Sequence, residues 1–509
     1  MGNRVKRALV VAVAATALLA MTSCDRVLIV SRAASGGDAN GHSGPSNALR
    51  VRGGVAIDGG GRVIAFESAA TDLLPGGNAA GLFVRDLQTG TIERIGVGYN
   101  PDLTPDARYL VYADSVYGPG EVRRLDRQTG QTIVVSVRPD GEPSRTDNSD
   151  VYNLNPSISD DGRYVAWESW SPDLVPGVVG WNVFARDLAT GSTELVSRAA
   201  DGGRANETSH TPAISGDGRF VAFSSWASNL TVGDTATGYR EIYVRDRVAG
   251  TTVKGSIDAA GEPVNYAALN PSINRDGRFV TFEGGGTVWV RDLVAATSEA
   301  AAVLPDGTPA GGVVPTISGD GRMVLFASAA PLKNADKNKH LDVYVRDLVR
   351  HATSQVSVDS KGGQGTGDSD HRWMSPVISD DGHVAAFATE AALSRSDANG
   401  YRDVYVRAAW RPTISSVSPS TLAPGTTATV VVTGDGFLDG AGAAIDDPAA
   451  PGVHVTGVEV VSATEVRVQV SVSADAALGP RSMTLWNRTA EPVVAASSVS
   501  PCVDCLAVA

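Results

Sequence analysis

The sequence predicts an all-β protein, a seven-bladed β-propeller closed by an N-terminal strand and followed by a C-terminal immunoglobulin-like β-sandwich. The first observation is an Asp-Gly-Arg corner, or a close variant, that recurs at Arg62, Arg108, Arg163, Arg219, Arg278, Arg322 and His383. The second is that each corner lies among short β-branched and aromatic runs bounded by Gly, Asp and Pro, which is the signal for strands and turns. A repeat of four strands at this period is typical of a propeller blade.

The clearest copy of the unit runs from Pro156 to Ser197, where we expect strands at 157–159, 164–168, 183–187 and 193–196. The third strands alternate apolar and charged residues, as in IYVRD (242–246) and VYVRD (343–347), which suits half-buried strands. The blades are expected to span 53–97, 101–137, 156–198, 212–257, 271–303, 315–358 and 376–407.

The N-terminal strand is expected to close the ring. VLIVS at 27–31 matches the fourth strand of the repeat, as in ELVS at 194–197, whereas the last repeat breaks off at 408–410 without a fourth strand. Residues 27–32 therefore complete the last blade of a propeller domain at 25–410, and this pairing removes two exposed sheet edges.

From Pro412 the corners vanish, and Val, Thr, Ala and Ser alternate in strands expected at 414–417, 427–433, 453–461, 465–472 and 481–486. This pattern predicts a small immunoglobulin-like β-sandwich at 411–490. The Ala/Ser/Val-rich segment 491–509 is expected to be a flexible tail. Within it, Cys502 and Cys505 could form a disulfide outside the cell.

Residues 1–24 have a basic start and an apolar run, which together predict an export signal. Its end, Met21-Thr22-Ser23-Cys24, resembles a bacterial lipobox, whose cysteine becomes the lipidated N-terminus of the cleaved protein. The expected product is a membrane-anchored lipoprotein on the extracytoplasmic face of the cell envelope. The alternative is an ordinary secretion signal with an incidental cysteine.

The chain has a formal net charge of −13. Cleavage after residue 23 would remove three positive charges (Arg4, Lys6 and Arg7), so the mature chain would carry −16 (−13 − 3). Such an acidic surface argues against nucleic acid as a partner, and it leaves the lipid anchor as the expected contact with the membrane.

The repeat PxISxDGRxVAFxSxAxxL…DVYVRDLxTGxTxxVS resembles the TolB-like propeller repeat family from Val27 to Arg407. PTISSVSPSTLAPGTTATVVVTGDGF (412–437) resembles the start of an IPT/TIG domain. These resemblances imply a binding scaffold joined to an extracellular spacer or adhesion unit. Some relatives carry a serine peptidase domain, but this chain has no GxSxG elbow.

Trp170 and Trp226 occupy the same repeat position in adjacent blades and are the candidate ligand-binding residues. Two exposed neighbouring indoles would suit a sugar ring or a side chain of a partner protein. The alternative is that they pack beneath their own loops, because large aromatic residues are usually mostly buried.

Two connections between second and third strands carry alternating Asp and Asn, whose oxygens are ligands that Ca²⁺ accepts. The candidate ligands are Asp336, Asn338 and Asp342 in blade six, and Asp397, Asn399 and Asp403 in blade seven. The alternative is that these side chains cap their own turns. No other cofactor is expected. His42, His210 and His371 lie in long interblade loops of different blades and predict no metal site.

These observations favour a non-catalytic envelope protein that recognises a protein or a polysaccharide through a propeller face. No catalytic residue stands out. One alternative is a hydrolase or lyase with two or more acids or histidines converging in the central funnel. The other is a structural envelope component with a featureless funnel. A propeller fold alone does not decide between them, because it hosts unrelated functions.

Overall fold

The computed structural model describes residues 27–44, 54–116, 120–144, 152–234, 238–264, 266–333, 336–359, 363–365, 367–369, 375–394, 397–408, 413–435, 437, 442–446, 452–462, 465–486 and 499–508. All regular secondary structure in this part is β-strand. Within the same residues, no helix has the length and apolar character needed to span a bilayer. The export signal and Cys24 lie outside the described residues.

Seven four-stranded antiparallel sheets form the propeller, as predicted. Blade one comprises β2 (Val55–Ile57), β3 (Val63–Ser68), β4 (Gly81–Asp86) and β5 (Ile92–Gly96). Blade two comprises β6 (Tyr99–Leu103), β7 (Tyr109–Ala113), β8 (Val122–Asp126) and β9 (Gln131–Val134). Blade three comprises β10 (Asn153–Ile158), β11 (Tyr164–Ser169), β12 (Asn182–Asp187) and β13 (Ser192–Leu195).

The remaining blades repeat this order. Blade four comprises β14 (Ser209–Ile214), β15 (Phe220–Ser225), β16 (Glu241–Asp246) and β17 (Thr251–Lys254). Blade five comprises β18 (Leu269–Ile273), β19 (Phe279–Gly284), β20 (Thr287–Asp292) and β21 (Thr297–Ala300). Blade six comprises β22 (Val313–Ile317), β23 (Met323–Ser328), β24 (Asp342–Asp347) and β25 (Ala352–Gln355). Blade seven comprises β26 (Val377–Ile378), β27 (Val384–Thr389), β28 (Asp403–Ala408) and, from the N-terminus, β1 (Leu28–Ile29).

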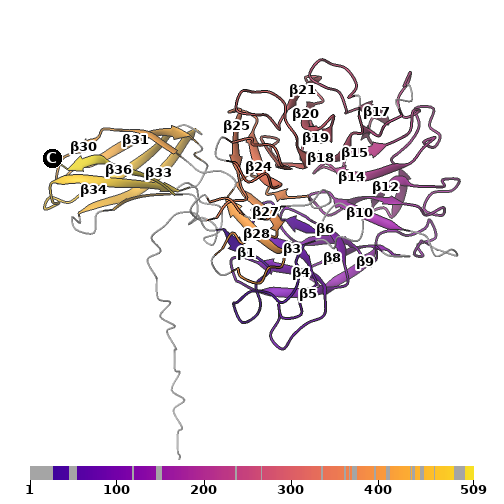
Figure 1. The fold of residues 1–509 in the computed structure, drawn as a ribbon, viewed down its shortest axis with the longest axis horizontal. Coiled ribbons are helices and arrows are strands. Elements are labelled where there is room, and N and C mark those ends of the chain that lie inside the picture. The colour runs from indigo at the N-terminus through magenta and orange to yellow at the C-terminus, as the bar shows by residue number, and fades with distance from the viewer. Residues whose placement is uncertain are drawn as a thin grey trace, which may run out of the picture.

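The predicted ring closure is confirmed. β1 pairs antiparallel with β28, with Leu28 opposite Val406 and Ile29 opposite Tyr405. The buried Ser31 hydroxyl then donates to the Asp403 carboxylate (2.6 Å) and accepts the Val404 N–H (3.0 Å). In Figure 1 the blades follow one another round the ring from indigo to orange, and β1 lies beside β28 where the ring closes.

Most first strands are longer than the sequence predicted. β10, for example, begins at Asn153 rather than at Ser157, because the strand continues across Pro156 through a β-bulge. Asn155, immediately before the proline, has a φ of 50°. Proline usually marks a strand boundary, but a bulge accommodates it. The same extension places His210 in β14 and not in the interblade loop predicted for it.

A ring of backbone hydrogen bonds joins successive blades near the axis. In each pair the backbone N–H of the first residue donates to the carbonyl oxygen of the second, at 2.9–3.3 Å. The pairs are Gly59–Pro105, Asp160–Gly216, Gly216–Arg275, Arg275–Gly319, Asp320–Asp380 and Asp380–Gly59. The junction of blades two and three lacks this bond because Pro105 has no N–H to donate. The approach is close: a Cβ on Gly216 would lie 2.5 Å from an Asp160 carboxylate oxygen.

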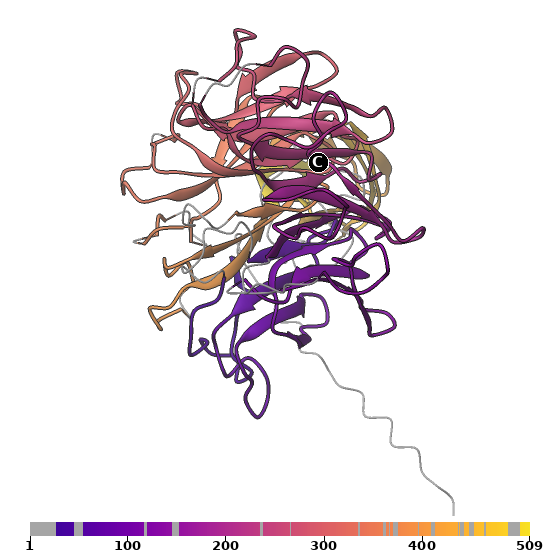
Figure 2. The same cartoon turned by 90° about the vertical axis from the view of Figure 1, so that its right-hand side faces the viewer.

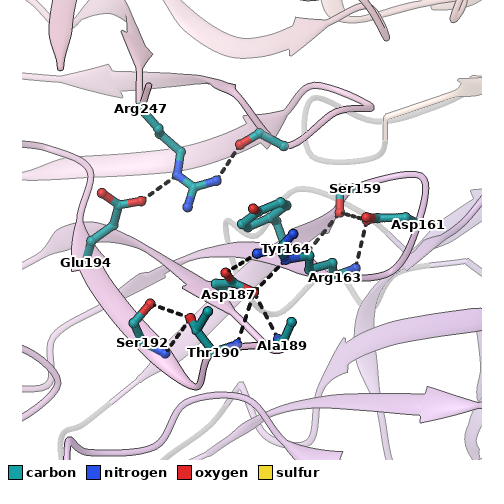
Figure 3. Close-up of polar contacts among 11 residues, drawn as sticks. Ser159, Asp161, Arg163, Tyr164, Asp187, Ala189, Thr190, Ser192, Glu194 and Arg247 are labelled. Carbon is teal, nitrogen blue, oxygen red and sulfur yellow. Dashed lines mark hydrogen bonds and ion pairs between the residues drawn. The ribbon is translucent and has the colours of Figure 1, made fainter. Parts of the chain in front are cut away.

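The recurrent corner is a structural device, as Figure 3 shows for blade three. The Arg163 guanidinium makes two hydrogen bonds to the Asp187 carboxylate at the end of β12 (2.8 and 2.7 Å), and Asp187 also caps the next turn by accepting the Ala189 N–H (2.9 Å). Asp161 accepts the Ser159 hydroxyl and the Arg163 N–H within its own turn. The equivalent pairs are Arg62–Asp86, Arg108–Asp126, Arg219–Asp246, Arg278–Asp292 and Arg322–Asp347.

The core lies between blades and is filled by the second and third strands. Buried aromatic pairs stack across these strands at centroid distances of 5.9–6.3 Å; examples are Phe66–Phe83, Phe223–Tyr243, Phe326–Tyr344 and Phe387–Tyr405. Such pairs add to the free energy gained by burying apolar area. At the closure, Val30 is fully buried in the cluster that joins blade one to blade seven.

The C-terminal domain is a β-sandwich of two four-stranded sheets. One sheet has the order β29 (Thr413–Ser418), β31 (Thr427–Asp435), β34 (Glu465–Val472) and β33 (Val453–Ser462). The other has the order β30 (Thr421–Leu422), β36 (Val499–Val508), β35 (Gly479–Trp486) and β32 (Gly442–Asp446). The domain lies beside the propeller in Figure 1 and behind it in Figure 2.

The prediction of a flexible tail at 491–509 is wrong for 499–508. These residues form β36, which pairs antiparallel with β35 and parallel with β30. The Ala/Ser/Val-rich composition was misleading, because β36 fills the centre of the second sheet and buries Leu506 and Val508. Cys502 and Cys505 lie in this strand, but their side chains are outside the described residues, so the disulfide stays a prediction.

Replacing Val30 with Asp should destabilise the whole propeller, because it would place an unpaired carboxylate in the core at the closure. We expect the free energy of unfolding to fall by more than about 4 kcal/mol. Urea unfolding would measure the loss. Val232→Asp is the matched control, since Val232 is 94% exposed and should change stability by less than about 0.5 kcal/mol. Equal losses in both variants would contradict the closure model.

Candidate functional site

The propeller has two unlike faces. Because the strands of each blade alternate in direction, one face carries the Asp-Gly-Arg corners and the turns between third and fourth strands; we call it the corner face. The other, the loop face, carries the connections between second and third strands and the loops between blades. The side chains of the corner arginines and third-strand aspartates are engaged with one another. The candidate site therefore lies on the loop face or along the axis.

Both predicted indoles are exposed on the loop face. Trp170 follows β11 and is 44% exposed, and Trp226 follows β15 and is 42% exposed. Neither is folded under its own loop, which was the alternative interpretation. Their backbones are held alike: the N–H of Trp170 donates to Tyr152 (3.1 Å) and that of Trp226 donates to Thr208 (3.0 Å).

Further aromatic side chains extend this pair across three blades. Trp181 meets Trp170 edge-on at 5.9 Å and stacks on Tyr152 at 5.9 Å. In the direction of blade five, Tyr239 and Tyr266 lie 6.1 Å apart and are 42% and 62% exposed. We call these residues the aromatic band: Tyr152, Trp170, Trp181, Trp226, Tyr239 and Tyr266.

Polar groups lie beside Trp181. The His210 ring contacts the Trp181 ring at 5.4 Å and places its Nδ1 3.4 Å from the Glu168 carboxylate. Burial alone would raise the pKa of Glu168, but the hydrogen bond and charge of His210, with the hydrogen bonds from Thr211 and Asn155, lower that pKa below its usual value. Glu168 is therefore ionised and held by its own partners.

Arg240 lies on the blade-five side of this cluster. Its guanidinium carbon lies 5.7 Å from the Trp226 ring centroid, which is within the range of a cation–π contact. Arg240 immediately precedes β16 and Trp181 immediately precedes β12, so the two residues occupy equivalent positions in blades four and three. The connections between second and third strands thus present an indole in blade three and a guanidinium beside an indole in blade four.

A cavity of about 230 Å³ runs along the propeller axis and is lined by the first strands. At its corner-face end the Arg275 guanidinium bridges Asp160 of blade three and Asp380 of blade seven. Asp102 lines the wall, and burial raises its pKa to about 6 although it accepts the N–H groups of Ile158 and Leu103. Acids do converge at the axis, as the enzyme alternative requires, but Arg275 neutralises two of them.

At the loop-face end, three glutamates, of which Glu67 and Glu168 are buried, each connect one blade to the next. The carboxylates of Glu67, Glu168 and Glu283 accept the backbone N–H groups of Asn100 (3.0 Å), Thr211 (2.6 Å) and Val314 (2.9 Å), respectively. Each N–H belongs to the bulged residue before the proline of the neighbouring first strand. These glutamates hold adjacent blades together and are not free to act on a ligand.

The predicted calcium ligands are held by hydroxyl groups. The Tyr344 hydroxyl donates to Asp336, and the Ser357 hydroxyl donates to Asp342 (2.6 Å). In blade seven Tyr405 and Ser31 engage Asp397 and Asp403 in the same way. Asn338 and Asn399 cap their turns by accepting the N–H groups of His340 and Tyr401. Among the described residues, no group of three or more His, Cys, Asp or Glu side chains is placed to hold a metal ion.

Blade four contains an internal cation at the equivalent place. The Lys254 ammonium bridges Asp234 (2.7 Å) and Glu241 (2.9 Å). Lys254 lies on the fourth strand of blade four, opposite Tyr243 of the third strand. The equivalent cross-strand pairs are Gln355 and Tyr344 in blade six, and Ile29 and Tyr405 in blade seven. Blades six and seven thus have a neutral residue there, and burial raises the pKa of Asp403 to about 6. Calcium binding at these two connections stays a prediction.

The histidines do not form a common site in the described structure. His42 accepts the Arg402 N–H through its Nδ1 (2.9 Å) near blade seven, whereas His210 contacts the aromatic band. His371 lies outside the described residues. His42 and His210 thus sit on different blades.

Sequence analysis missed Trp181, Arg240, Tyr239 and Tyr266. Trp181 and Arg240 share a detectable signal, since each directly precedes a third strand. Tyr266 lies in an interblade loop, where the repeat pattern fades, and only the folded ring brings it to Tyr239.

The similar structures are propellers. TolB from Acinetobacter baumannii is 14% identical, with 65% of this chain and 77% of TolB covered and a TM-score of 0.35. Oligogalacturonate lyase VPA0088 from Vibrio parahaemolyticus is 12% identical, with 76% and 98% covered and a TM-score of 0.44. The β-propeller domain of the Trilobed protease from Pyrococcus furiosus is 11% identical, with 72% and 93% covered and a TM-score of 0.44. These likenesses concern the fold alone.

Residues 411–496 match the family model of quinohemoprotein amine dehydrogenase, alpha subunit domain III. The matched segment coincides with most of the β-sandwich. The predicted fold, a seven-bladed propeller followed by an immunoglobulin-like β-sandwich, is confirmed by the sheet order. Among curated protein sequences no match to the chain is found.

The buried Glu67 should make stability depend on pH. Burial raises its pKa from 4.5 to about 7, so the folded state keeps a proton that the unfolded state has lost between these values. Stability should therefore fall by about 3 kcal/mol as pH rises from about 4.5 through 7, and the loss is complete only above pH 7, once the folded state has also released the proton. Glu67→Gln should remove this contribution to the pH dependence of stability, and at pH 8 it should unfold at a higher urea concentration than wild type. Urea unfolding between pH 4.5 and 8 would test it; parallel curves for both proteins would contradict it.

Proposed function

We propose that this protein is a non-catalytic binding protein of the cell envelope that recognises a protein or a polysaccharide through the loop face of blades three to five. The observation that carries the proposal is the exposure of Trp170 and Trp226 at equivalent positions of adjacent blades. Exposed indoles with polar neighbours are typical of recognition surfaces, because they present apolar area together with a hydrogen-bond donor.

The axial cavity is less suited to catalysis than the loop face is to binding. A glycosidase or lyase site would need an acid and a base of different protonation free to meet a substrate. Asp160 and Asp380 are instead ion-paired with Arg275, and Asp102 accepts the backbone N–H groups of its neighbour Leu103 and of Ile158 in blade three. These contacts favour a structural role for the axial carboxylates.

Binding should depend on both indoles. The purified protein would be tested on a glycan array and on solubilised envelope proteins, and Trp170→Ala/Trp226→Ala should lower the affinity at least about tenfold, since interface tryptophans often contribute 2 kcal/mol or more. Tyr401→Ala is the matched control: Tyr401 is 38% exposed, but it belongs to blade seven. Saturable binding that both variants keep would reject the aromatic band as the site, and no binding to either panel would reject the recognition function.

We further propose that the protein is exported and anchored by a lipid on Cys24. The lipobox-like end of the apolar leader supports this placement. Cys24→Ala should move the protein from the membrane fraction to the soluble extracytoplasmic fraction and abolish incorporation of labelled palmitate. Thr22→Ala, which keeps the cysteine, is the control. If Cys24→Ala stayed in the membrane fraction, the anchor would be rejected.

A further inference from the structure

We infer that the ligand is a linear polysaccharide that carries carboxylates, with Arg240 binding a uronate carboxylate beside a sugar ring stacked on Trp226. The inference rests on the proposed binding function and narrows its ligand to one chemical class. Three observations carry it: an arginine without a partner, a neighbouring glutamate that is already satisfied, and the course of the aromatic band.

Arg240 is a partly buried cation of this face that has no counterion among the described residues. Within the described part of the chain its guanidinium makes no ion pair and no hydrogen bond, and its Nε atom is buried. Burial lowers the pKa of this guanidinium, as expected for a charge that has lost water without gaining an anion. A buried donor left unsatisfied costs free energy, and a carboxylate can satisfy a guanidinium through two parallel hydrogen bonds.

Glu168 does not supply that anion. The charge of Glu168 raises the pKa of Arg240 and partly opposes the effect of burial. Its two oxygens, however, already accept hydrogen bonds from Asn155 (2.8 Å) and Thr211 (2.6 Å), and the His210 Nδ1 lies 3.4 Å away. It lies 5% exposed beneath the surface. The pairing position of Arg240 is therefore open to a group from outside the chain.

The aromatic band favours a chain of sugar rings over a compact anion. Trp170 on blade three, Trp226 on blade four and Tyr266 in the loop before blade five are all exposed, so rings that follow one another along a polymer could each meet an aromatic face. Apolar faces of pyranoses stack on indoles, while the carboxylate of a uronate projects from the ring edge, where a guanidinium beside the indole can reach it.

The experiment uses the purified protein and three immobilised uronate polymers, hyaluronan, alginate and polygalacturonate, each beside its carboxyl-reduced form. We expect at least one acidic polymer to bind about tenfold or more tightly than its reduced form, and Arg240→Gln to remove that preference. Trp226→Ala should weaken binding to both forms. Arg240→Lys keeps the charge without the paired donors and should retain an intermediate preference.

Arg204→Gln is the matched control, because Arg204 is an exposed arginine of the loop before β14 with no ring contact in the described residues. Equal affinity for acidic and reduced polymers, or equal effects of Arg204→Gln and Arg240→Gln, would overturn the inference and leave the proposed function standing. Binding to envelope proteins but to no polysaccharide would likewise overturn the inference and leave the proposed function standing. Absence of binding to polysaccharides and envelope proteins alike would overturn both.

Discussion

The pairing of β1 with β28 is the interaction on which the rest of the structure depends. In this protein the strand that completes the last sheet comes from the opposite end of the chain. The buried bond of Ser31 to Asp403 fastens this strand within blade seven, and the packing of Val30 links blade seven to blade one at the same place. With β1 in place, blade seven has four strands like the other six blades.

Around the axis, the blades are joined by two sets of contacts with different chemistry. At the corner face, backbone hydrogen bonds connect successive turns, and Arg275 spans the channel to two carboxylates. At the loop face, glutamates such as Glu67 reach the bulged residue of the next blade. Each set satisfies polar groups that would otherwise be buried without partners. The charged groups near the axis therefore hold the ring of blades together.

The corner face and the loop face differ in how their charged side chains are paired. The corner arginines pair with third-strand aspartates in six blades, which leaves that face with few unpaired polar groups. On the loop face the connections are longer and differ between blades. They can therefore carry an indole in one blade, a lysine-bridged acid pair in another and a guanidinium without a partner beside Trp226.

The blade count, the strand order and the closing role of residues 27–32 could be predicted from the sequence, because periodic corners and β-runs are local signals repeated many times. Trp170 and Trp226 were found for the same reason. The contact of Arg240 with Trp226, the bridge of Arg275 between blades three and seven, and the central strand at 499–508 became visible only in the folded protein. These contacts join residues distant in sequence or lie in variable connections, and no local pattern encodes which partner the closed fold brings to them.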